Sequence, residues 1–157
     1  EVVTKRNSDQ EMIPCSEVAF KYQGSCYFEL PYFWNTLLTD DYSRMGQLCQ
    51  SLPADAYQSC FEGVGRAILA ASDDDSGPNL SDNCAKMPSK EAEGNCVLRA
   101  VSILAATYGE KKYKTENEFY FIPAPKTDLC QDLSGNQKND CLSRVKEFNC
   151  LKLGKCN

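Results

Sequence analysis

Residues 49–64 read CQSLPADAYQSCFEGV, with two cysteines eleven positions apart and a proline between them. Before Pro53, apolar side chains recur at the spacing of one helical face, and after it the same spacing starts again. Proline ends the first helix because it lacks a backbone N–H, yet it suits the first turn of the next one. The stretch therefore predicts two helices folded into a hairpin, with these residues on the facing stripes: Tyr42, Met45, Leu48, Cys49 and Leu52, then Tyr57, Cys60, Phe61, Val64 and Ile68.

The same pattern occurs four times along the chain. The cysteine pairs are Cys15 with Cys26, Cys49 with Cys60, Cys84 with Cys96, and Cys130 with Cys141. An apolar residue stands three positions after each first cysteine, and others stand one and four positions after each second cysteine. Such self-similarity indicates a repeat protein. The residues at these three positions are Val18, Leu52, Met87 and Leu133; Tyr27, Phe61, Val97 and Leu142; and Leu30, Val64, Ala100 and Val145.

We therefore expect a single all-α domain over residues 1–157, built from four helical hairpins stacked as a short α-solenoid. Three details follow from local sequence: the first unit's helix starts or kinks at Pro31, Thr39 or Asp40 caps the next helix, and the last helix ends near Phe148. The expected units are residues 12–38, 39–73, 80–109 and 126–157, with an insertion at 110–125 that is extended near 117–125.

We expect the cysteines to pair locally, one disulfide per hairpin, because the two members of each pair approach each other when the chain turns back. A bridge that closes a loop of about 12 residues stabilises the fold by roughly 3 kcal/mol. Cys150 and Cys156 would close a small terminal ring. Pairing between neighbouring units is the alternative, and the sequence alone does not decide between the two.

Composition points to an oxidising compartment. The chain has ten cysteines and no C-x-x-C pair, begins at Glu1 without an apolar leader, and has no run long enough to span a membrane. We expect a processed protein that is secreted, periplasmic or otherwise extracytoplasmic. The absence of histidine excludes histidine-ligated metals and Ser-His or Cys-His catalysis. A net charge of −5 disfavours a nucleic-acid partner. No cofactor, metal site or catalytic residue is predicted.

The period of 34 to 35 residues resembles that of tetratricopeptide repeats, which are also built from helix pairs. The stretch from Gly63 to Ala67 is similar to the small-residue packing positions of that family, although the family's Trp, Leu-Gly and Tyr signature is missing. The resemblance implies a curved helical array that binds proteins, and it implies no particular functional residue.

The insertion holds the best candidate binding site. A charged segment leads into Phe119, Tyr120, Phe121 and Ile122, and two prolines follow. Two interpretations remain open: the strip folds back to fill a groove of the helix array, or it docks a protein partner, since aromatic residues are common interface anchors. The lysines nearby, Lys111, Lys112 and Lys114, are interpreted as a solvated face.

A second connection, residues 73–83, is acidic and is expected to be a solvated loop. Its spacing does not fit an EF-hand, which leaves only a weak, irregular calcium site as an alternative. It contains the one glycosylation sequon, Asn79-Leu80-Ser81.

The remaining candidates have ordinary structural interpretations. Trp34, Tyr32 and Phe33 are expected in the core, and Glu29 and Glu62 are expected at helix starts rather than in catalysis. The sequence thus favours a non-catalytic, extracytoplasmic binding or assembly subunit with a protein partner. A secreted carrier with an apolar cavity is the first alternative, and a carboxylate-dependent hydrolase is the second.

Overall fold

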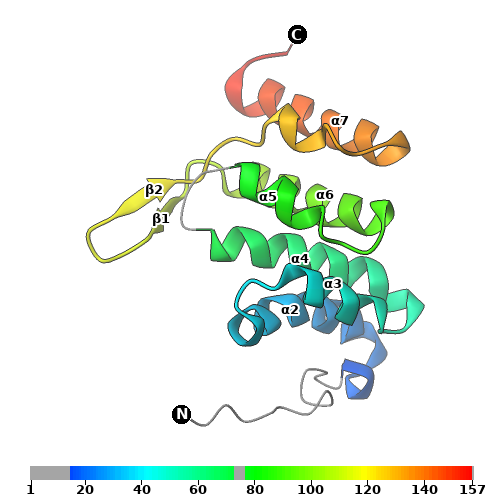
Figure 1. Ribbon diagram of the computed structural model, residues 1–157. Helices are drawn as coiled ribbons and strands as arrows, with labels where there is room; N and C mark the ends of the chain where they lie inside the picture. Colours follow the sequence, from blue (N-terminus) through cyan, green and yellow to red (C-terminus); the bar gives the residue numbers. More distant parts are fainter. Residues whose placement is uncertain (1–14, 73–76, 157) are drawn as a thin grey trace.

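The computed structural model describes residues 15–72 and 77–156 and is mainly helical (Figure 1). Four long helices dominate it, and each packs on the next in chain order, so that α2 and α7 lie at opposite ends of the stack. The all-α class expected from the periodicity is confirmed. The long helices are α2 (Phe20–Leu38), α4 (Tyr57–Ala71), α6 (Lys90–Thr107) and α7 (Gly135–Leu153).

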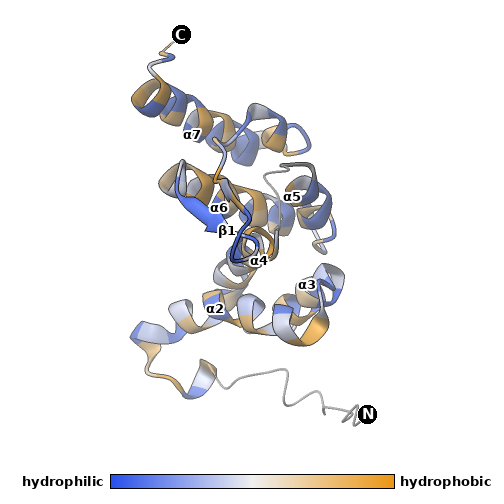
Figure 2. Cartoon of the chain, turned by 90° about the vertical axis from the view of Figure 1, so that its left-hand side faces the viewer, coloured by the Kyte–Doolittle hydropathy of each residue, from blue (hydrophilic) through white to orange (hydrophobic). Residues whose placement is uncertain are grey.

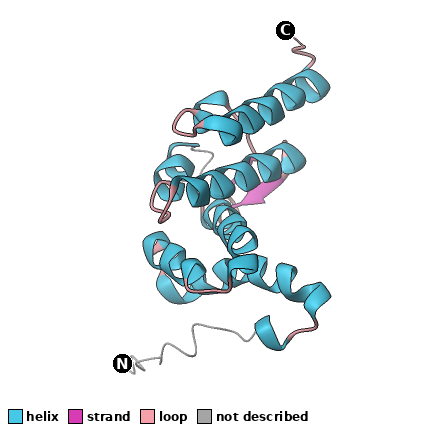
Figure 3. Ribbon diagram, turned by 90° about the vertical axis from the view of Figure 1, so that its right-hand side faces the viewer, coloured by secondary structure: helices cyan, strands magenta, loops and turns pink. Residues whose placement is uncertain are grey.

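Shorter elements precede the long helices, and they differ between units (Figure 3). The two central units have an α-helix here, whereas the last unit and the described residues of the first unit, which start at Cys15, have a turn of 3₁₀ helix. The expectation of two α-helices was therefore wrong for the last unit, and residues 12–14 of the first expected unit lie outside the described residues. In the last unit, Pro123 and Pro125 keep the preceding chain extended and leave room for a single turn. The short elements are η1 (Cys15–Glu17), α3 (Tyr42–Gln50), η2 (Ala54–Ala56), α5 (Gly77–Cys84) and η3 (Thr127–Cys130).

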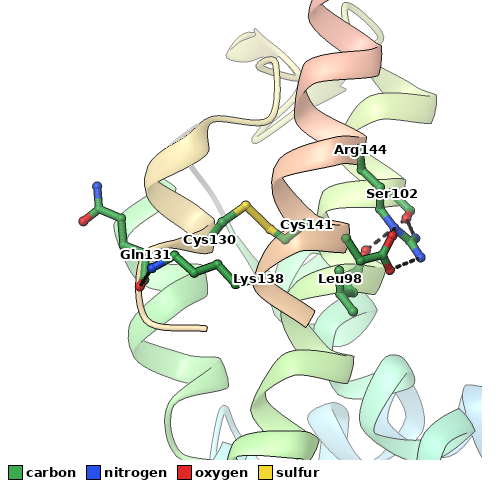
Figure 4. The surroundings of a disulfide bond; sticks show 8 residues. Leu98, Ser102, Cys130, Gln131, Lys138, Cys141 and Arg144 are labelled. Carbon is green, nitrogen blue, oxygen red and sulfur yellow. Dashed lines mark hydrogen bonds and ion pairs between the residues drawn. A yellow bond between two sulfur atoms is a disulfide. The ribbon is translucent and has the colours of Figure 1, made fainter. Parts of the chain in front are cut away.

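Each of these short elements except η2 carries a cysteine bonded to the long helix that follows it. The structure contains local pairs rather than pairs between units, with sequence separations of 11, 11, 12 and 11. Cys150 and Cys156 close a terminal ring, so no cysteine is free. Figure 4 shows the last hairpin, where Lys138 of α7 donates to the carbonyl of Gln131 at 2.9 Å beside the Cys130–Cys141 bridge.

The core runs along the seam between the long helices. All four residues four positions after the second cysteine of each pair are buried, and so are the bridged cysteines that face them, apart from Cys26. Leu142 is an exception among the repeat positions, because it is exposed on the outer side of α7. The buried residues at the four-position site are Leu30, Val64, Ala100 and Val145.

Helix α4 is held close to both of its neighbours by two glycines. A Cβ atom at Gly63 would lie 3.0 Å from the carbonyl carbon of Phe28 in α2, and one at Gly65 would lie 3.0 Å from that of Cys96 in α6. Carbon atoms in ordinary contact are about 3.5 to 4.0 Å apart. The two backbones therefore approach α4 at distances that only glycine permits.

Three helix ends differ from the positions that the sequence predicted: the start of α2, the cap of α3 and the end of α7. Helix α2 begins at Phe20 and passes through Pro31, whose ring fits because the facing residue, Gly63, has no side chain. Asp41, not Thr39 or Asp40, caps α3: its carboxylate accepts a hydrogen bond from the Arg44 N–H at 3.0 Å.

The C-terminal ends of α2 and α7 are set by residues with positive φ values. Thr39 and Asp40 have positive φ values of 49° and 64°, so both form the turn before the cap. Helix α7 continues past Phe148 to Leu153, where Gly154 adopts the left-handed conformation typical of a helix C-terminus.

The insertion forms a β-hairpin that projects from the side of the helix stack (Figure 1). Strand β1 (Lys111–Tyr113) pairs antiparallel with β2 (Phe119–Phe121), and the Thr115 hydroxyl accepts hydrogen bonds from the amides of Asn117 and Glu118 in the turn. The sequence predicted an extended segment near 117–125 but placed 111–113 in a charged linker. Strand β1 was not predicted because two of its three residues are lysines, which are uncommon in strands.

Candidate functional site

The hairpin is fixed to the end of α4 by one lysine. The Lys112 ammonium donates hydrogen bonds to the carbonyls of Leu69, Ala70 and Ser72 at 2.9, 3.1 and 2.9 Å. These carbonyls have no partner within the helix, and a cation is favourable at this negative end of the helix dipole. The Tyr120 hydroxyl adds a bond to the Ser72 carbonyl at 3.1 Å. Lys112 and Tyr120 therefore anchor the inner face of the hairpin with four hydrogen bonds.

The outer face of the hairpin is aromatic and open to solvent. The register places Lys111 opposite Phe121 and Tyr113 opposite Phe119, so these four side chains share one face. Their exposed fractions are large: 61% for Tyr113, 47% for Phe119 and 60% for Phe121. We call these four residues the aromatic face.

The aromatic face is internally ordered. The Phe119 and Phe121 rings meet edge to face with centroids 5.7 Å apart, and the Tyr113 ring lies 6.2 Å from that of Phe119. The Lys111 ammonium lies 3.8 Å from the centroid of the Phe119 ring, within the range of a cation–π interaction. Three rings and one cation therefore form a single preformed patch.

The four residues predicted as a candidate binding site, 119–122, face two different ways. Phe119 and Phe121 point away from the helices, whereas Tyr120 and Ile122 point toward them and are partly buried. Tyr120 and Ile122 thus fit the groove-filling interpretation, whereas Phe119 and Phe121 are exposed, as the docking interpretation requires; the alternation follows from the two-residue period of extended chain. Figure 2 shows the hairpin in front of α4 and α6.

Behind the hairpin lies a partly open cavity of about 240 Å³. The C-terminal halves of α4 and α6 form one wall, and the chain that follows β2 forms the opposite one. Side chains from α5 and η3 complete it. Most of the lining is aliphatic, and it includes Leu69, Leu80, Ile103, Leu104, Ile122 and Leu129.

The two glutamates considered as catalytic carboxylates belong to ion pairs between successive helices. Glu29 of α2 pairs with Arg66 of α4, and Glu62 of α4 pairs with Arg99 of α6 at 2.9 Å. Both glutamates lie within their helices, not at the helix starts expected from the sequence. The Arg99 guanidinium also lies 4.7 Å from the Phe28 ring centroid.

Arg144 of α7 extends this pattern to the last long helix. It donates to the Ser102 hydroxyl of α6 and pairs with Asp140 on its own helix (Figure 4). One arginine on each of α4, α6 and α7 thus reaches back to the preceding long helix.

The other residues predicted from the sequence are dispersed. Asn79 is exposed on α5, which occupies part of the segment expected to be a loop. Positions 73–76 of the candidate calcium loop lie outside the described residues. Trp34 is fully buried, as predicted, but Tyr32 and Phe33 are exposed because they occupy the outer side of α2.

One titratable group has a strongly perturbed environment. Burial of Tyr42, together with its hydrogen bond to the Asp40 carboxylate at 3.0 Å, raises the pKa of the phenol well above its usual range. At the surface, a hydrogen bond to Glu93 raises the pKa of Lys90. The raised pKa of Tyr42 favours the neutral phenol, which suits a structural hydrogen bond rather than acid–base chemistry near neutral pH.

The cavity was missed in the sequence because its lining comes from five separate segments. The only local signal was the aliphatic pair Leu69 and Ile103 at positions that the helical stripe did not need. Within residues 15–72 and 77–156, no helix has the combined length and apolar character required to cross a bilayer. No protein-family model, curated protein or solved structure matches this chain.

Proposed function

We propose that this chain is a non-catalytic protein-binding or assembly subunit that acts outside the cytoplasm. In this proposal, four disulfide-stapled units stack as a short α-solenoid, similar in layout to tetratricopeptide repeats, and the aromatic face of the hairpin docks a protein partner. The observation that carries the proposal is the exposure of Tyr113, Phe119 and Phe121 on a hairpin that Lys112 anchors.

A partner that covers these rings would remove their apolar surface from water. Aromatic residues dominate interface energies because each buries about 150 to 250 Å². An anchored hairpin also presents its rings without the large ordering cost that a mobile loop would carry on binding. Tyr113, Phe119 and Phe121 meet both conditions, and their neighbour Lys111 supplies a charge at the edge of the patch.

Two observations support the solenoid part of the proposal. The Glu29–Arg66 and Glu62–Arg99 pairs have the same sequence separation, 37 residues, and both link one long helix to the next. Each long helix packs mainly on its immediate neighbours in the chain. Nearest-neighbour packing with a repeated linking contact is the pattern expected of a stacked repeat protein.

Extracytoplasmic location is proposed from the cysteines. All ten are paired, and four of the five bridges lie within single hairpins. In the cytosol, glutathione would keep these cysteines reduced. Oxidative folding is therefore part of the proposal.

The test compares the aromatic face with exposed aromatic side chains elsewhere, at the start of α2. The variant Phe119→Ser/Phe121→Ser removes two rings of the face, and Phe20→Ser/Tyr22→Ser removes two exposed rings from α2. Proteins that co-purify with the wild-type chain are identified, and their affinity for each purified variant is then measured by calorimetry. We expect loss of one partner, by more than tenfold in Kd, for the hairpin variant alone.

Equal weakening by both variants would reject the aromatic face as a specific site. A partner that binds the hairpin variant with wild-type affinity would reject it as well. In either case, circular dichroism of each variant must match the wild type, so that lost binding is not lost folding.

The cavity behind the hairpin favours a second candidate, a carrier of a small apolar ligand, because its lining is largely aliphatic. No observation on the described residues favours the third alternative, a carboxylate-dependent hydrolase.

A further inference from the structure

The charged residues in the described lining of the cavity are opposite in sign to the net charge of the chain. The sequence has 22 acidic residues and 17 basic ones. Among the described residues that line the cavity, however, the charged ones are all cations, namely Arg66, Lys112 and Lys126. An aliphatic cavity with cations and no carboxylate in its described lining is complementary to an apolar chain that ends in a negative group.

The three cations are not equivalent. Arg66 already pairs with Glu29, and the Lys112 ammonium uses its three hydrogens on the carbonyls at the end of α4. Lys126 is exposed, and its side chain makes no hydrogen bond or ion pair with any described residue. Lys126 is therefore the cation available to a ligand.

The volume limits the length of the apolar part. A water molecule in the liquid occupies about 30 Å³, and a methylene group occupies nearly the same space. The cavity of about 240 Å³ accordingly holds a chain of roughly eight carbons. Two acyl chains of a membrane phospholipid would exceed this volume.

We propose that the cavity between α4, α6 and the segment after β2 binds a single-chain fatty acid of about eight to ten carbons, with its carboxylate paired to Lys126. The proposal rests on the second candidate function, the ligand carrier, and names its ligand class. It does not depend on the aromatic face, which lies on the other side of the same hairpin.

The first test is a calorimetric titration of the intact oxidised protein at pH 7 with butanoate, hexanoate, octanoate, decanoate and dodecanoate. Each methylene that enters an apolar site should lower Kd by about fourfold, which corresponds to the transfer free energy of one CH₂ group. We expect this decrease to continue to eight or ten carbons and then to stop. A Kd that does not depend on chain length would overturn the proposal.

The second test isolates the head group. 1-Octanol has a similar chain without the charge, and it should bind about threefold to fivefold more weakly than octanoate because an exposed ion pair contributes modestly. Lys126→Glu should weaken octanoate by about tenfold and leave 1-octanol unchanged. Lys146→Glu makes the same charge change at an exposed position of α7, and it should leave the affinities for octanoate and 1-octanol unchanged.

The outcomes separate the two levels of the proposal. Equal affinity for 1-octanol and octanoate would reject the fatty-acid assignment while leaving an apolar carrier in place. Failure of every chain to bind would reject both the assignment and the carrier. Ala124→Phe, which fills the cavity, should abolish octanoate binding, whereas Phe119→Ser/Phe121→Ser should leave it intact. If Ala124→Phe does not fold, Lys126→Glu decides.

Discussion

Replacing Gly65 by alanine tests whether the close approach of α4 and α6 holds the stack together. In an isolated helix this change would stabilise by about 1 kcal/mol, because glycine is a poor helix former. In the folded chain, the new methyl carbon would overlap the carbonyl oxygen of Cys96, its nearest neighbour, and would lie 3.0 Å from the carbonyl carbon and 3.3 Å from the Cα atom of that residue. These are backbone atoms, so no side-chain rotation relieves the contact.

The expected magnitude follows from these distances. Restoring ordinary contacts of at least about 3.5 Å requires α4 and α6 to separate by at least half an ångström along a buried seam. Overpacking of this kind costs about 1 to 3 kcal/mol, and here it acts on the backbone, so the upper half of that range applies. After the gain in helix propensity, Gly65→Ala should destabilise the fold by about 1 to 2 kcal/mol.

Gly24→Ala is the matched control because it makes the same change within α2. Its nearest neighbour would be the Ser59 hydroxyl at 3.7 Å, an ordinary contact. This variant should gain about 0.5 to 1 kcal/mol from helix propensity alone. Guanidinium chloride unfolding with the disulfides intact, followed by circular dichroism, measures both. If Gly65→Ala were as stable as Gly24→Ala, the helices would not be in the close contact described.

Three further predictions concern other parts of the molecule. Replacing Cys84 and Cys96 by serine should lower the unfolding free energy by about 3 kcal/mol in urea titrations, because the loop of about 12 residues is no longer closed in the unfolded chain. Because burial raises the pKa of Tyr42, this phenol costs no stability below about pH 10, and the unfolding free energy should decline as the pH rises further; in thermal melts, this decline should be smaller for Tyr42→Phe. Lys112→Met removes three bonds to the end of α4, so amide hydrogen exchange should accelerate in both hairpin strands and little in α6.

The sequence predicted features that depend on spacing alone. Two cysteines eleven positions apart on either side of a turn approach each other when the hairpin forms, and the apolar residue four positions after each second cysteine lies on the buried face of its helix. Periodicity therefore identified the helical class and the core residues Leu30, Val64, Ala100 and Val145, and it favoured the local bridges without deciding between them and bridges between units.

Features that depend on a distant neighbour were not predictable. Pro31 is tolerated inside α2 because Gly63, on another helix, leaves space for its ring. Strand β1 is rich in lysine, and its pairing depends on β2 and on the end of α4. The cavity requires five segments to converge, and no local pattern records such a convergence.

The most direct test of the proposed docking site compares the two faces of β2 by thermal unfolding. Phe119→Ser/Phe121→Ser should change Tm by no more than about 4 °C, because substitutions at exposed positions cost at most about 0.5 kcal/mol each and 1 kcal/mol shifts Tm by about 2 to 4 °C in a domain of this size. Tyr120→Ser/Ile122→Ser, which changes the anchored face of β2 and the residue that follows it, should lower Tm by more than about 4 °C. A large drop for the Phe119 and Phe121 variant would assign those rings to the core and contradict the proposal that they form a free docking surface.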